Sequence, residues 1–287
     1  MGDLSHLQPE TRLVRFTTTE TALTCGTVVG YYVAGVVARL YGDIYVFVLT
    51  GSYLLLALLY CCLRLDNIQP QKEELTTGWL ERLTCLLTVL SKPRQGRSRQ
   101  MVQLFCVLFI LQEAPRGFEN TLKVLYIIEK FDWDSYQLLH YNALSSLCSG
   151  VGQFLIFPVL HKVMKIPLML VGLMTVLSRT AYYLILAFPL HSSYLSVAAA
   201  VNCLIGVQAI IIRSGLAASL PSTELGTVFA INEIVVTFLP ILLSPVANAI
   251  YRITACAGCF QGAWAVVTCC PIIMQLPLFL ALYFIET

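Results

Sequence analysis

A few charged side chains interrupt the long apolar runs of this sequence, and these residues have the chemistry to bind or move charge. Arg213 follows three isoleucines in the run VQAIIIRSGLAASL, and Glu233 lies in the next apolar run. A guanidinium at the centre of a membrane helix costs about 2.5–3.5 kcal/mol on insertion scales. We therefore expect Arg213 to be retained for a purpose: a structural salt bridge with Glu233, a gate or a substrate clamp.

Three further places carry ionisable side chains within apolar segments. Glu20 lies near the start of the first segment, and Arg179 lies near the middle of VGLMTVLSRTAYYLIL. Glu113, Arg116 and Glu119 recur at helical spacing, so that they share one helix face. Because ionisable groups inside a membrane commonly mark ion and substrate paths, we predict a substrate or proton pathway that consists of Glu20, Glu113, Arg116, Arg179, Arg213 and Glu233.

Each of these positions also has a purely structural explanation. Glu20 could be a first-turn acid that the helix dipole favours, and the Glu113–Glu119 face could mark the outer end of a short helix. Arg179 could tie helices together through backbone carbonyls. Arg213 could extend to the cytosolic interface. The sequence leaves these alternatives open.

Catalytic, metal and nucleic-acid chemistry is not expected. The four histidines are isolated, and no HExxH, GxSxG or glycine-rich phosphate loop occurs. The lone pair Cys256-x-x-Cys259 lacks the further ligands of a metal site. A formal net charge of +2 does not suggest nucleic acid. We expect no enzyme, no metal, no cofactor and no nucleic-acid partner.

The composition indicates a protein embedded in a lipid bilayer. Hydrophobic residues make up 57% of the chain and charged residues only 12%, whereas a soluble domain has about 25% charged residues. A spanning helix needs about 20 mostly apolar residues. Eight segments qualify, at about 19–39, 43–63, 101–123, 137–160, 166–189, 194–217, 227–250 and 260–284. The sequence predicts an all-α, multi-pass membrane protein with about eight transmembrane helices.

The basic residues predict the orientation of these helices. They concentrate between the second and third segments, at Arg64, Lys72, Arg82, Lys92, Arg94, Arg97 and Arg99. The positive-inside rule places this loop in the cytosol, and alternation places the turn SLPSTELG there as well. Within the loop, residues 79–90 have the spacing of an amphipathic interfacial helix, and a loosely packed linker is the alternative.

Several polar motifs occur in an order that resembles one transporter family. Arg213 is followed by Glu224-x-Gly226-x-x-Phe229 and then by Asn248-x-x-Tyr251. The other motifs are Arg15 with Glu20, Leu125-Tyr126, Trp133-Asp134-Ser135 and Ser98-Arg99. This pattern resembles solute carrier family 46, the proton-coupled folate transporter-like members of the major facilitator superfamily.

The resemblance implies a fold, a domain division and residue roles. The superfamily has twelve helices in two six-helix bundles, and this chain resembles helices five to twelve. Residues 1–65 would be the last two helices of an N-terminal bundle, 66–100 a basic cytosolic inter-bundle loop, and 101–287 a six-helix C-terminal bundle. Glu20 matches a glutamate linked to proton coupling, and Arg213 an arginine linked to proton and substrate binding. Glu224 and Gly226 match the family's conformational turn.

The resemblance also implies a secondary-active transporter that symports protons with an organic anion, folate-like or another amphipathic solute, driven by a proton gradient. Folate itself is disfavoured, because Met101, Gly215 and Ala218 stand where the folate transporter has basic residues. The alternative is a truncated, non-transporting membrane protein or a scaffold that associates with a full-length paralogue. The membrane would be the plasma membrane or an endosomal or lysosomal membrane.

Overall fold

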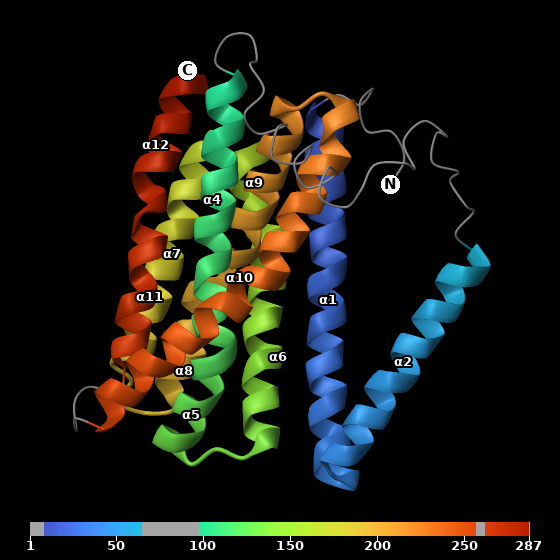
Figure 1. The fold of residues 1–287 in the computed structure, drawn as a ribbon, viewed down its shortest axis with the longest axis vertical. Helices are drawn as coiled ribbons and strands as arrows, with labels where there is room; N and C mark the ends of the chain where they lie inside the picture. The colour runs from blue at the N-terminus through green and yellow to red at the C-terminus, as the bar shows by residue number, and fades with distance from the viewer. Residues whose placement is uncertain (1–8, 65–97, 257–261, 287) are drawn as a thin grey trace.

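The computed structural model describes residues 9–64, 98–256 and 262–286, and long helices dominate these residues (Figure 1). Eight helices are long and apolar enough to cross a membrane. They run over Leu13–Tyr41, Asp43–Leu63, Arg99–Phe118, Ser135–Val163, Leu168–Ala187, Ser193–Ser219, Glu224–Thr254 and Ala263–Ile285. The prediction of an all-α membrane protein with about eight spanning helices is confirmed.

The helices divide into regular and irregular segments. The α-helices are α1 (Pro9–Tyr41), α2 (Asp43–Arg64), α4 (Ser98–Phe118), α5 (Val124–Phe131), α6 (Ser135–Val151), α7 (Leu168–Ala187), α8 (Ser193–Val201), α9 (Ile205–Ser219), α10 (Ser222–Cys256), α11 (Ala263–Ile273) and α12 (Gln275–Glu286). Three π-helical segments, η1 (Glu119–Lys123), η2 (Gly152–Ile156) and η3 (Val159–Val163), and the 3-10 segment η4 (Asn202–Leu204) interrupt them. The third apolar segment thus continues through η1 as far as Phe131 and keeps Pro115 inside α4.

Helices α4 to α12 form a bundle around an aromatic and aliphatic core. Its largest fully buried side chains include Phe105, Tyr126 and Trp264. Helix α1 packs along α6 and also contacts α9, so it completes one side of the bundle. Helix α2 contacts α1 and otherwise stands apart from the bundle (Figure 1), and none of its apolar window is buried.

The turn between α5 and α6 shows how local sequence ends one helix and begins the next. Asp132 ends α5 in the left-handed conformation with φ of 53°. The Asp134 side chain then accepts a hydrogen bond from the backbone N–H of Gln137 at 2.8 Å, and the Gln137 side chain accepts one from the backbone N–H of Asp134 at 3.2 Å. This capping box satisfies donors that the first turn of α6 would leave unpaired.

Two glycines allow irregular segments to approach closely in the middle of the bundle. A Cβ atom at Gly152 in η2 would overlap the backbone carbonyl of Cys203 in η4. A Cβ atom at Gly206 in α9 would overlap the side chain of Gln153. Glycine is therefore required at position 152, where the close neighbour is backbone, whereas at position 206 the Gln153 side chain would have to move.

The order of the helices agrees with alternating passage through a membrane. The first residues of α1 and α4 and the last residues of α12 lie at the same end of the bundle (Figure 1). The expected amphipathic helix at 79–90 lies outside the described residues, as does Cys259 of the CxxC pair. The division into residues 1–65, 66–100 and 101–287 stays a prediction.

Candidate functional site

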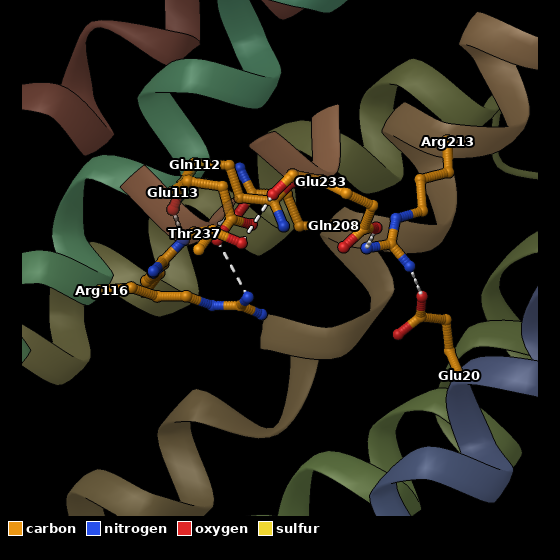
Figure 2. A network of polar contacts seen from close by, with 9 residues as sticks. Glu20, Gln112, Glu113, Arg116, Gln208, Arg213, Glu233 and Thr237 are labelled. Carbon is orange, nitrogen blue, oxygen red and sulfur yellow. Dashed lines mark hydrogen bonds and ion pairs between the residues drawn. The ribbon is translucent and has the colours of Figure 1, made fainter. Parts of the chain in front are cut away.

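Arg213 of α9 holds the charge cluster that joins α1, α9 and α10. Its Nη1 atom forms an ion pair with Oε1 of Glu20 on α1, and its Nη2 atom lies 3.6 Å from Oε1 of Glu233 on α10. Figure 2 shows the guanidinium directed toward the Glu20 carboxylate. A salt bridge with Glu233 was one of the explanations that the sequence left open for Arg213. The sequence did not predict Glu20 as the partner from the other end of the chain.

The exposure of these three side chains shows that the contact of Arg213 with Glu20 is more buried than its contact with Glu233. The side chains of Arg213 and Glu20 are only 22% and 15% exposed, whereas that of Glu233 is 65% exposed. Glu20 lies well inside α1, which begins at Pro9, so the first-turn explanation for this acid does not apply. The cluster combines one cation with two carboxylates, so the uptake of one proton would leave it neutral.

Arg179 of α7 lies in the middle of the bundle and is only 2% exposed. Its Nη1 atom donates to the backbone carbonyl of Gln112 at 3.1 Å and to the side-chain oxygen of Gln208 at 3.4 Å. Gln208 in turn donates to Gln275 of α12. Arg179 therefore links α4, α7, α9 and α12, which is the structural explanation that the sequence offered for it.

The three ionisable residues expected on one face of the third helix divide between two ion pairs. Glu113 and Arg116 form an ion pair at 2.9 Å, in which Glu113 is 1% exposed and Arg116 is 48% exposed. Both side chains extend from α4 in Figure 2. Glu119 begins the π-helical segment η1 and instead forms an ion pair with Lys123 at 2.9 Å.

Glu119 also accepts two hydrogen bonds from α7. The hydroxyl of Tyr182 donates to one carboxylate oxygen at 3.1 Å, and the hydroxyl of Tyr183 donates to the other at 2.8 Å. The sequence analysis missed Lys123, Tyr182, Tyr183 and Gln208. The one available signal was the spacing of Glu119 and Lys123, which is the i, i+4 spacing of a helical ion pair.

The turn with Glu224 and Gly226 lies at the start of α10. The backbone N–H of Glu224 donates to the carbonyl of Pro221 at 3.1 Å. No heavy atom of a described residue would lie within 4 Å of a Cβ atom at Gly226. The role of this turn in a conformational change stays a prediction. Within the described ranges, no group of three or more His, Cys, Asp or Glu side chains could hold a metal ion.

Comparison with known proteins identifies a family model and a relative. Residues 5–245 match the model described as Major Facilitator Superfamily. A Drosophila melanogaster protein described as "Probable peptidoglycan muropeptide transporter SLC46" is 24% identical over 210 residues, which are 72% of this chain and 40% of that protein. The chain thus spans about two-fifths of the length of the relative that it matches.

Proposed function

Because this chain belongs to the major facilitator superfamily, we propose that it takes part in the proton-coupled transport of an organic anion, with Arg213 as the anion-binding group. The ion pair between Arg213 and Glu20 is the observation that carries this proposal. The eight apolar helices and the similarity to a protein described as a probable muropeptide transporter support the general class.

The charges of the Arg213 cluster suggest how a proton and an anion could be coupled. A charge in a membrane helix is stable when it is paired. When Glu20 takes up a proton, its ion pair with Arg213 is lost. The guanidinium then becomes available to the carboxylate of a substrate, which replaces the lost negative charge. In this scheme the proton and the anion enter the site together.

The same ion pair connects segments that alternating access would move apart. Glu20 lies on α1 and Arg213 on α9, which the predicted domain division assigns to different bundles. Transporters of this kind rock one bundle against the other around a central site. Protonation of Glu20 would therefore weaken a contact between the bundles while it exposes the anion-binding group.

The name of the relative suggests a first cargo to test. Muropeptides carry peptide carboxylates, so they belong to the organic anions that a guanidinium can bind. We propose a muropeptide or a chemically similar amphipathic anion as the substrate of this chain, with a proton gradient as the driving force.

Uptake of a radiolabelled muropeptide by proteoliposomes that contain the chain tests this function. Arg213→Ala should reduce uptake roughly 10- to 100-fold, because a hydrogen bond to a charged group contributes about 1.5–3 kcal/mol. Glu20→Gln should weaken the dependence of uptake on pH. Arg252→Ala and Asp43→Asn, at exposed positions, serve as matched controls. Equal uptake by wild type and Arg213→Ala would contradict the anion-binding role, and unchanged pH dependence in Glu20→Gln would remove Glu20 from coupling.

Association with a full-length paralogue is the second candidate function. Gly26 and Gly30 on α1 have the four-residue spacing of small residues that favours helix pairing in membranes. A Cβ atom at either position would meet no described atom within 4 Å. Copurification of the chain with a full-length carrier, combined with no uptake by the chain alone, would favour this role. A Gly26→Leu variant should then lose the association.

A further inference from the structure

A polar cavity separate from Arg213 lies between α1, α6, η1 and η4. Its volume is about 230 Å³. Hydroxyl, amide and charged groups line it, and those used below are Thr24, Glu119, Lys123, Ser146 and Asn202. Within the described residues, it is thus a polar space on the side of the bundle that α1 covers.

Asn202 supplies a hydrogen-bond acceptor that is buried and unused. The residue is 4% exposed, and its Oδ1 atom has no hydrogen-bond partner among the described residues. A buried acceptor without a partner costs about 1–3 kcal/mol, and buried polar atoms are nearly always paired. Asn202 is one of the residues that line the cavity, so a molecule that binds there with an O–H or N–H group could supply the missing donor.

The two charged side chains at the cavity, Glu119 and Lys123, already neutralise each other, so the cavity does not require a charged ligand. Glu119 accepts from Lys123, Tyr182 and Tyr183, so its charge is neutralised and both of its oxygens accept hydrogen bonds. Lys123 has three N–H donors and uses one of them on Glu119. The cavity therefore offers donors from Lys123, an acceptor from Asn202 and hydroxyls that can do either. This combination fits an uncharged group with hydroxyl or amide functions.

Irregular helix geometry supports a binding role for the same place. Glu119 and Lys123 belong to the π-helical segment η1, and Asn202 belongs to the 3-10 segment η4. The π-helical segment η2 packs against η4, the segment that carries Asn202. Short π-helical segments inside α-helices are rare and frequently lie at functional sites.

The size and position of the cavity relate it to Arg213. Ligand pockets that hold a whole small molecule have volumes of about 300–1,000 Å³, so the cavity accommodates only part of such a molecule. Asn202 and Arg213 lie on the consecutive segments η4 and α9. At about 1.5 Å per residue they are about 16 Å apart along the helix. An extended ligand could contact both.

We propose that this cavity is the subsite for the uncharged, hydrogen-bonding part of the transported anion, a part rich in hydroxyl or amide groups. Asn202 accepts a hydrogen bond from it, and Lys123 and Ser146 donate to it. The inference rests on the proposed function, which assigns the anionic end of the same molecule to Arg213.

Saturation-transfer NMR on the purified chain in lipid nanodiscs tests the subsite with small probes. N-acetylglucosamine supplies hydroxyls and an amide, and N-acetylglycinamide supplies amides alone, so the two probes distinguish a sugar-like from a peptide-like moiety. We expect at least one probe to bind, and its affinity to fall about fivefold or more in Asn202→Ala and in Ser146→Ala. Asn248→Ala, the same change at an exposed position on α10, should bind as wild type.

Hexanoate, which carries a carboxylate and no other polar group, separates this inference from the proposed function. Its binding should fall in Arg213→Ala. If Arg213→Ala binds hexanoate as tightly as the unmodified chain while the neutral probes bind as expected, the anion-binding role is refuted and the cavity remains a site for neutral ligands. The subsite is refuted if neither neutral probe binds, or if Asn202→Ala and Ser146→Ala, both eluting as wild type, bind as tightly as the unmodified chain.

Discussion

The largely buried ion pair of Glu119 with Lys123 allows a quantitative prediction. The side chains of both residues are about 15% exposed, at 14% for Glu119 and 15% for Lys123. Replacement of Lys123 by methionine keeps an unbranched side chain that is one atom shorter and removes its charge. The Glu119 carboxylate would then remain buried with only the hydroxyls of Tyr182 and Tyr183 as partners.

The expected loss of stability follows from the removal of one partner. Removing one member of a buried ion pair costs about 3–5 kcal/mol, because the other charge is left without compensation. At roughly 2–4 °C per kcal/mol, Lys123→Met should lower Tm by about 6–20 °C. Intrinsic tryptophan fluorescence during heating provides the measurement. Trp264 is fully buried, and its ring lies edge-on to that of Tyr183 at 6.4 Å between centroids, so its emission reports on this region.

Two variants decide whether charge is the cause. Lys130→Met makes the same substitution at an exposed position one helical segment later, and we expect it to change Tm by only a few degrees. Glu119→Gln combined with Lys123→Met removes both charges and should recover part of the lost stability. If Lys130→Met lowers Tm as much as Lys123→Met, or if the double variant recovers nothing, the reasoning from a buried uncompensated charge is refuted.

Two further predictions concern packing and the central hydrogen bonds. Gly152→Ala should destabilise the chain by about 1–3 kcal/mol, because its Cβ atom would overlap the Cys203 carbonyl. Gly26→Ala should not destabilise it, because no described atom lies within 4 Å of a Cβ atom there. Equal Tm values for the two variants would contradict the close approach of Gly152 to the Cys203 carbonyl. Arg179→Met should lower the free energy of unfolding by about 2–4 kcal/mol, since it leaves two acceptors without their donor. Arg252→Met, at an exposed position, should leave Tm nearly unchanged. Similar Tm values for both variants would exclude the role of Arg179 in linking the helices.

The spanning helices could be predicted from the sequence because their length is a physical requirement of the bilayer. Predicted and observed helices share most residues, as in 43–63, which the structure places at Asp43–Leu63. The third helix was predicted to end at residue 123, but its helical path continues to Phe131. Its second half contains charged residues and Pro115. The packing of α4 and η1 against α10 and the hydrogen bonds of Glu119 to α7 are tertiary effects that the apolar pattern of one segment does not contain.

The polar contacts could be predicted only where chain connectivity brings residues together. Arg213 and Glu233 lie at similar distances along the chain from one short turn, so the sequence alone indicates that they lie at similar depth in the membrane. Glu20 lies on a helix that is remote in sequence, and its contact with Arg213 depends on how α1 packs against α9. No feature of the sequence indicated Asn202, since a single asparagine in an apolar run is common. Only the structure shows that this side chain is buried and that its Oδ1 atom has no hydrogen-bond partner among the described residues.

The charge balance of the polar clusters indicates which one suits the proton coupling that we propose. Glu119 has one cation and two hydroxyl donors as partners, so a change in its protonation would leave Lys123 buried without its counter-charge. Arg213 differs, because two carboxylates approach it and one of them, Glu233, is largely exposed. Protonation of Glu20 still leaves a negative charge within 3.6 Å of Arg213. The Arg213 cluster can therefore change its charge without leaving a buried cation unpaired, whereas the Glu119 cluster is suited to a fixed structure.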